Sequence, residues 1–419
     1  MKDFIKVLSG NIVAQGLGFI ALLIVARNLS VETYGLFSVF LALFVVLGQL
    51  HDFGLSVSFV KKGSELRHNK QDYNTLFTTA LVLRIIVSVS FIVLLLPFSN
   101  QIASFLLNNT QYSDQVQLII LSAPLYSLFL FLLSYFQAQQ KFNLYSLSNV
   151  SLYLVRFFAA VIIAYLLIPK SQNTLFLYVD AFIFAYAIAI VFILVMLYFK
   201  APVKFEKLFD SIYAKELLSL GFWAFLSALA IMLILRIDIF MLQKLSTSHS
   251  VGLYAAAFQV AMVFPLVTSA LFTTVFPKAQ EYIEKYSLDS YITKTLSLAK
   301  YTFPLLLLVE LFAYFLFPLL YGENYSSGTI TLMILLVSFA LEIFINPLIS
   351  LFYLYKKAHL YFGIILLQLV LNFIGNWYLI PLYNENGAAV ATTLARSAGL
   401  ILIVYFSFHF SKLNNIKGT

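Results

Sequence analysis

The chain has 419 residues, of which 62% are hydrophobic and only 11% are charged. These proportions lie far outside the range of soluble domains and indicate a polytopic membrane protein. A net charge of +8 would suggest a nucleic-acid partner in a soluble protein. In a membrane protein the positive-inside rule explains the charge, so no nucleic-acid partner is expected. The absence of cysteine excludes disulfides, thiolate metal sites and cysteine nucleophiles.

Uncharged runs of about 20 residues, long enough to cross roughly 30 Å of hydrocarbon, recur along the chain. Helices satisfy their own backbone groups in lipid, and the runs lack the alternation of barrel strands. The first run follows Lys2 and Lys6 but is too long for a signal peptide. We predict an all-α integral membrane protein with about twelve transmembrane helices, at 7–27, 34–60, 73–96, 114–137, 146–168, 175–199, 217–241, 250–275, 297–318, 328–352, 359–380 and 387–410.

Lysine and arginine residues concentrate in every second connecting segment. With a cytoplasmic N-terminus, 19 of the 26 lie on the cytoplasmic side and four within predicted helices. The three on the outer side are Arg27, Lys170 and Lys244. This asymmetry predicts that both termini are cytoplasmic.

Two sequence anchors recur at a constant offset. Leu29-Ser30 is followed 216 positions later by Leu245-Ser246, and Lys141-Phe-Asn-Leu-Tyr145 by Lys357-Ala-His-Leu-Tyr361. The offset predicts two tandem halves related by an axis along the membrane normal, with a binding cavity between them and alternating access. We assign the N-terminal six-helix bundle to 1–200, a cytoplasmic linker with a short interfacial helix to 201–216, and the C-terminal six-helix bundle to 217–419.

Four arginines lie inside predicted helices: Arg84, Arg156, Arg236 and Arg396. A cation near the bilayer centre costs at least about 2.5 to 3.5 kcal/mol, so each needs a reason. Guanidinium groups bind phosphate oxygens in a bidentate manner, and we interpret the four as binding residues for an anionic, lipid-linked substrate. The alternatives are structural ion pairs and, above all for Arg236, snorkelling to the membrane surface.

Glu310 and Glu342 lie near mid-depth, where a carboxylate that changes charge could couple transport to a proton or sodium gradient. Pairing with a buried arginine is the alternative for these two acids, and Asp238 and Asp52 are the next candidates for coupling. The five histidines lack metal-ligand spacing, and no phosphate-binding loop is present. We therefore expect no catalytic residue, metal or cofactor.

Short motifs along the whole chain resemble those of one family. Arg236-Ile-Asp238, followed by Gly252-Leu-Tyr254 and then Pro277, resembles the start of the second half of polysaccharide-repeat flippases. These belong to the multidrug/oligosaccharidyl-lipid/polysaccharide (MOP) exporter superfamily. Further similar pieces are Arg27-Asn-Leu-Ser30 with Tyr34-Gly-Leu-Phe37, His51-Asp-Phe-Gly-Leu55, Tyr321-Gly-Glu-Asn-Tyr325 and Gly387-Ala-Ala-Val-Ala-Thr392.

The resemblance implies a flippase that moves undecaprenyl-pyrophosphate-linked oligosaccharide repeat units of O-antigen or capsular polysaccharide. The direction would be from the cytoplasmic to the periplasmic leaflet of a bacterial inner membrane. It also implies a cationic cavity between two six-helix bundles. Besides membrane lipids, a polysaccharide polymerase and a chain-length regulator are expected partners.

Three alternatives stay open. A drug or cation exporter of the same superfamily should have an acidic cavity, whereas this chain has four arginines at depth. Lipid II flippases usually carry charged residues well inside the first two helices, but the first helix here is uncharged until Arg27. A membrane polysaccharide polymerase or ligase usually has a large outer loop with its active site, and the longest one here, Pro97 to Ser113, holds no charge.

Overall fold

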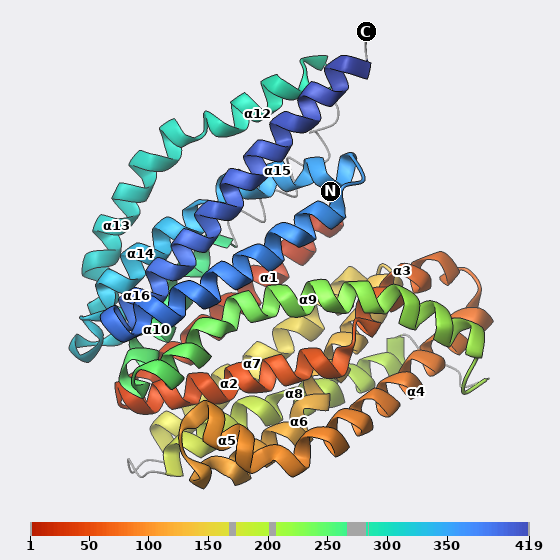
Figure 1. Ribbon diagram of the computed structural model, residues 1–419. Coiled ribbons are helices and arrows are strands. Elements are labelled where there is room, and N and C mark those ends of the chain that lie inside the picture. Colours follow the sequence, from red (N-terminus) through yellow and green to blue (C-terminus); the bar gives the residue numbers. More distant parts are fainter. Residues whose placement is uncertain (1, 167–172, 201–206, 266–281, 284, 418–419) are drawn as a thin grey trace. The chain divides into compact units, whose positions relative to one another are not determined.

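The computed structural model describes residues 2–166, 173–200, 207–265, 282–283 and 285–417 (Figure 1). Within these ranges every regular element is a helix, which confirms the predicted all-α fold. The chain forms two compact units, Met1–Arg236 and Ile237–Thr419. The boundary between the units falls inside α9 (Ser211–Leu245), so this helix contributes to both.

Unit 1 packs around buried aromatic side chains. Helix α1 lies along α7, α2 along α6, and α7 along α8. Phe37, Phe40 and Phe44, at near-helical spacing on α2, are fully buried and form edge or tilted contacts with rings of α6 and α8. Before α9 the helices are α1 (Lys2–Asn28), α2 (Val31–Asp52), α3 (Leu55–Leu66), α4 (Lys70–Leu95), α5 (Ser99–Leu107), α6 (Ser113–Ala138), α7 (Phe142–Leu166) and α8 (Asn173–Lys200).

Unit 2 has its core where α12 and α15 pack against α16. Ile292, Leu348 and Phe352 are fully buried there. Its helices after α9 are α10 (Ser248–Ala261), α12 (Leu288–Leu296), α13 (Ala299–Tyr321), α14 (Gly328–Ala340), α15 (Glu342–Leu354) and α16 (Ala358–Lys417).

The predicted helix 34–60 is broken in the structure into α2 and α3. Phe53 and Gly54 both adopt left-handed backbone angles, with φ of 47° and 71°. Helix α9 passes so close that a Cβ atom on Gly54 would overlap the carbonyl oxygen of Gly221. Only glycine satisfies both the backbone angle and the close approach. The sequence signal for this break is the Phe53-Gly54 pair inside an otherwise apolar run.

The two helices predicted at 359–380 and 387–410 are continuous in α16 except at Asn384, which has a φ of 50° and a ψ of −128°. The two segments pack against each other, because a Cβ on Gly375 would lie 2.9 Å from that of Ala391. In the same way α14 and α15 divide the predicted helix 328–352 at Leu341.

Ten helices in the described residues are long and apolar enough to span a membrane, which makes the protein a multi-pass membrane protein. The predicted number of twelve stays a prediction. Part of the predicted helix 250–275 falls at 266–281, outside the described residues, and α16 counts as a single span.

Two connecting segments differ from their predicted form. In the linker assigned to 201–216, residues 201–206 lie outside the described part, and 211–216 are the first turns of α9 rather than a separate interfacial helix. The segment from Pro97 to Ser113, predicted to be an outer loop, is largely helical, because it contains α5. Apolar Phe98 and Phe105 are exposed there.

The repeat found in the sequence reappears in backbone geometry. Gln140 and Lys356, 216 positions apart, both have a φ of 55°. The next residue in each half closes the end of a helix, with Lys141 N–H donating to the Phe136 carbonyl at 2.8 Å. Lys357 N–H donates to the carbonyl of Phe352 at 2.7 Å. Both halves therefore turn in the same way before α7 and α16.

Candidate functional site

Arg84 is buried in an ion pair rather than free. Its Nη1 lies 3.0 Å from Asp52 Oδ1, and both side chains are almost fully buried. The guanidinium also donates to the hydroxyl of Ser127 and, at 2.5 Å, to the carbonyl of the same residue. Ser56 at the start of α3 completes the network. Arg84 thus ties α4 to α2, α3 and α6 at the break, as the structural alternative predicts.

Arg156 has a different environment. Its Nε and Nη2 both donate to the carbonyl of Phe182 on α8, each at 3.2 Å. Its guanidinium carbon lies 4.9 Å from the ring centroid of Tyr186 and 5.2 Å from that of Phe182. No carboxylate in the described part of the chain lies within ion-pair distance. The positive charge of Arg156 is therefore stabilised by two aromatic ring faces and one backbone carbonyl.

Arg236 faces the same cluster from α9. It lies within electrostatic reach of Arg156 and of the tyrosine hydroxyls of α6, α7 and α8. Its buried Nε has no hydrogen-bond partner among the described residues. The side chain is partly buried within unit 1. The three tyrosines are Tyr126, Tyr153 and Tyr186.

Glycines on neighbouring helices make room for two of these rings. A Cβ on Gly48 of α2 would lie 2.5 Å from Cδ1 of Tyr126, and one on Gly18 of α1 would lie 2.7 Å from Cδ1 of Tyr153. Both distances are too short for real side chains. Glycine at these two positions therefore leaves the space that the tyrosine rings occupy.

We name Arg156, Arg236, Tyr126, Tyr153 and Tyr186 the arginine-tyrosine cluster. Two like charges in an apolar environment repel each other, and neither has a carboxylate partner among the described residues. An anion with several oxygens would relieve this repulsion and accept hydrogen bonds from the guanidinium and phenol groups. The cluster therefore has the chemistry of an anion-binding site with aromatic walls.

Asp238, two residues after Arg236, is the centre of a second polar cluster, in unit 2. Its side chain is 1% exposed. The carboxylate accepts hydrogen bonds from Tyr254 of α10 at 2.5 Å and from three groups of α16. Those groups are Asn372 at 3.1 Å, Asn376 at 2.6 Å and Thr392 at 2.8 Å.

This carboxylate has no cationic partner in the described residues, because all four of its hydrogen-bond donors are neutral. A buried, unpaired negative charge is costly, so the group is suited to take up a cation or a proton. The amide oxygen of Asn376 is also buried without a partner among the described residues. Oxygen atoms of this kind suit a hard cation better than a soft transition metal. No group of three or more His, Cys, Asp or Glu residues with metal-binding geometry occurs in the described ranges.

Arg396 and Glu342 form a second ion pair, at 2.5 Å, in unit 2. The guanidinium carbon of Arg396 lies 4.2 Å from the ring centroid of Phe339. The pair is partly exposed, with 11% and 19% of the two side chains accessible. Glu310 lies on α13, where most neighbouring side chains are exposed, and no ion pair to it occurs within the described residues. The structure thus brings Arg156 together with Arg236, and places Arg84 and Arg396 in ion pairs.

Sequence reasoning found the charged members of both clusters and missed their neutral members. The three tyrosines were indistinguishable from the other 23 tyrosines of the chain. One signal for the second cluster was available in the repeat. Asn372 lies 216 positions after Arg156, so equivalent places in the two halves hold a cation and a neutral amide.

The family described as "Polysaccharide biosynthesis protein" matches residues 1–283. A protein of Shigella flexneri, whose name ascribes O-antigen transport to it, is 23% identical over 336 residues, covering 78% of this chain and 77% of that protein.

Solved structures show the same fold. The lipid II flippase MurJ in an inward closed conformation gives a TM-score of 0.75 at 15% identity, covering 97% of this chain and 87% of that one. A multidrug resistance MATE family transporter of the MOP superfamily gives 0.70 at 14% identity, covering 97% and 96%. These relatives are transporters and flippases, not enzymes, which confirms the predicted transporter class. The chain belongs to the polysaccharide biosynthesis protein family and has the fold of the MOP transporters.

Proposed function

We propose that this protein is a flippase for undecaprenyl-pyrophosphate-linked oligosaccharide repeat units. It moves them by alternating access from the cytoplasmic to the periplasmic leaflet of a bacterial inner membrane, with both termini in the cytoplasm. The family and the Shigella flexneri relative support a transporter of polysaccharide precursors. A polysaccharide polymerase and a chain-length regulator would act on the delivered units.

The arginine-tyrosine cluster is the observation that carries this proposal. Two guanidinium groups without carboxylate partners among the described residues offer bidentate hydrogen bonds to a pyrophosphate or an acidic sugar. The surrounding phenol rings offer flat faces and hydroxyl donors to sugar rings. A pocket for cationic drugs would need the opposite charge, so this cluster favours an anionic substrate over the exporter alternative.

We further propose that Asp238 couples transport to a proton or sodium gradient. Among the four candidate acids, Asp52 and Glu342 are paired with arginines, whereas Asp238 is buried among neutral donors. Glu310 is the second candidate. Asp238→Asn, which keeps the shape but not the charge, should stop gradient-driven transport in vesicles while substrate still binds. Normal gradient dependence of this variant would move the role to Glu310.

The deciding experiment locates the substrate after loss of the protein. Deletion of the gene should cause undecaprenyl-linked single repeats to accumulate in the cytoplasmic leaflet, where an impermeant glycosidase added to spheroplasts cannot cleave them. Accumulation in the outer leaflet would instead indicate a polymerase or ligase.

A second experiment distinguishes a flippase for oligosaccharide repeats from a lipid II flippase. Purified protein in vesicles should expose lipid-linked oligosaccharide repeats, but not lipid II, to the external glycosidase. Movement of lipid II at the same rate would assign the protein to peptidoglycan synthesis, as for the MurJ flippase that shares its fold.

A further inference from the structure

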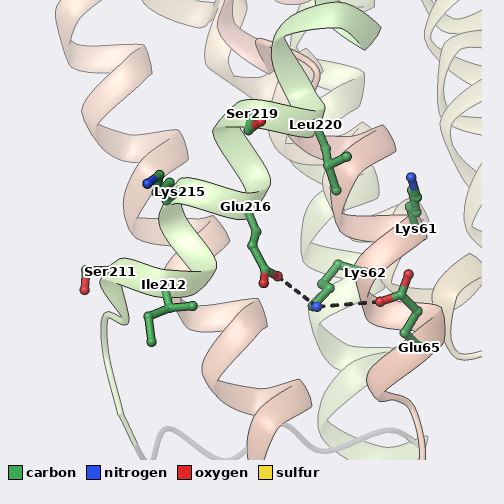
Figure 2. A pocket seen from close by; sticks show the side chains of 9 residues that line it. All are labelled: Lys61, Lys62, Glu65, Ser211, Ile212, Lys215, Glu216, Ser219 and Leu220. Atoms are coloured by element: carbon green, nitrogen blue, oxygen red, sulfur yellow. Dashed lines mark ion pairs between the residues drawn. The ribbon is translucent and has the colours of Figure 1, made fainter.

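A charged groove lies between α3 and the first turns of α9, both within unit 1 (Figure 2). It has a volume of about 880 Å³. It is separate from the arginine-tyrosine cluster, since none of its lining residues belongs to that cluster. Its lining contains three lysines, two glutamates and the apolar side chains of Ile212 and Leu220.

One lysine of the groove already has partners. Lys62 of α3 lies 2.8 Å from Glu216 of α9 and 3.6 Å from Glu65 of its own helix. Figure 2 shows its ammonium group between the two carboxylates. The hydrogen bond to Glu216 raises the pKa of Lys62, so this ammonium stays charged and joins the two helices.

Lys61 and Lys215 are the two remaining cations. Both side chains are exposed, and neither ammonium group forms an ion pair or a hydrogen bond with a described residue. In Figure 2 they extend on either side of the pair formed by Lys62 and Glu216. With three ammonium and two carboxylate groups in the lining, the groove has a net charge of +1. This balance suits a ligand with a single negative charge.

The apolar lining shows what else the ligand must contain. Ile212 is 68% and Leu220 37% exposed, and Phe222 and Trp223 on the next turn are 44% and 68% exposed. Tryptophan is enriched at the membrane surface, where its ring lies at the level of the lipid headgroups. A small inorganic anion would leave these apolar side chains without a partner, whereas an acyl chain would cover them.

We propose that this groove binds the headgroup of an anionic glycerophospholipid from the leaflet on the lysine-rich side of the membrane. Lys61 and Lys215 contact the phosphodiester, and Ile212 and Leu220 contact the first part of an acyl chain. Glu65 and Glu216 disfavour a dianion, so the groove discriminates against the diphosphate of a transport substrate. The lipid joins α3 to α9 beside the Lys62 ion pair.

The test uses the purified full-length protein in a neutral detergent. Short-chain phosphatidylglycerol, short-chain phosphatidylcholine and inorganic phosphate are titrated while the melting temperature is followed, since a ligand that binds only the folded state raises it. Phosphatidylglycerol should raise the melting temperature in a saturable way. The other two compounds should have no such effect.

The variants then locate the site. Lys61→Gln combined with Lys215→Gln should weaken phosphatidylglycerol binding by about tenfold or more, because each lysine near anionic lipid contributes a several-fold factor. Lys300→Gln, an exposed lysine of unit 2, is the matched control and should bind as the wild type does. Glu65→Gln should bind several-fold more tightly, and this single variant tests the proposal even if the double variant does not fold.

Three results would overturn the proposal. Unchanged affinity in the double variant would exclude the two lysines. A saturable effect of inorganic phosphate alone would indicate a site for small anions. Tighter binding of a short prenyl diphosphate than of phosphatidylglycerol would place the groove on the substrate's path instead.

Discussion

Arg156 and Arg236 differ from the other two membrane arginines in their partners. Arg84 and Arg396 each contact a carboxylate, at 3.0 and 2.5 Å. Arg156 and Arg236 have tyrosine side chains, a backbone carbonyl and each other nearby, and neither forms an ion pair in the described part of the chain. The same residue type therefore supports two different roles, and we expect the roles to separate in mutagenesis.

Replacement of Arg156 or Arg236 by alanine should abolish surface polysaccharide without loss of protein from the membrane. No carboxylate of the described chain is left unpaired by either change. Lysine at the same positions should restore activity only in part, because a point charge cannot make bidentate hydrogen bonds. Lectin staining of cells and immunoblots of membranes measure the two quantities. Normal surface polysaccharide in both alanine variants would exclude the cluster as the substrate site.

Arg84→Ala should act on stability instead. Removing one member of a buried ion pair leaves Asp52 uncompensated, at a cost of about 3 to 5 kcal/mol. The second change, Asp52→Asn, removes that charge, so the double variant should melt at a higher temperature than Arg84→Ala alone. A single variant that is stable but inactive would show that Arg84 contacts substrate.

The charged residues could be predicted from the sequence, because an ionised side chain in an apolar run stands out. Their partners could not. Whether Arg84 meets Asp52 depends on how α2, α4 and α6 pack, and 32 positions separate the two residues. The four neutral groups around Asp238 come from three different helical segments. A pattern along the chain cannot bring such groups together.

Among the helices, α9 contributes one charged residue to each of the two polar clusters. Arg236 and Asp238 are two positions apart, which is about 200° of rotation in an α-helix. The two side chains therefore project to opposite sides, and the contacts place one in unit 1 and the other in unit 2.

The start of α9 is fixed by Asp210. Its carboxylate accepts hydrogen bonds from the backbone N–H groups of Ile212 at 2.8 Å and Tyr213 at 3.4 Å. The hydrogen bond from Lys207 and that from the Ile212 N–H lower the pKa of the Asp210 carboxyl below its ordinary value of 3.8. An anionic cap at this position also interacts favourably with the helix dipole.

Asp210→Ala should therefore lower the melting temperature at neutral pH. A depressed pKa in the folded state means that the stabilisation is present above the unfolded value and is lost as the pH falls through the folded value. The difference between wild type and variant should shrink at pH values below about 3.8. Melting curves in detergent at neutral and acidic pH measure it. A difference that stays constant or grows in acid would contradict this account.

At the scale of the molecule, the orientation predicted from lysine and arginine is open to a direct test. The chain has no cysteine, so single cysteines can be introduced without background. Cysteine at Asn69 or Tyr286 should be shielded from impermeant thiol reagents in intact cells, and cysteine at Asn109 or Asn384 should react. The reverse labelling would overturn the orientation.

The all-α fold followed from composition, because an apolar chain in lipid has few ways to satisfy its backbone. The irregular places did not follow. The break at Phe53 and Gly54, the turn at Asn384 and helix α5 depend on local backbone angles, to which a hydropathy pattern is insensitive. The constant offset of 216 positions found in the sequence is also present in the structure, where both halves have the same turn at Gln140 and Lys356.

The close approach of Gly54 to Gly221 has a genetic consequence. Every missense change in a glycine codon adds at least one carbon atom, and at Gly54 that atom would overlap the carbonyl oxygen of Gly221. The positive φ of 71° penalises the same substitutions independently. In a saturation library selected for surface polysaccharide, alanine at this codon should be depleted as strongly as tryptophan. Chemical similarity would then not predict fitness at this position, whereas at exposed Gly363, with no atom nearby, it should.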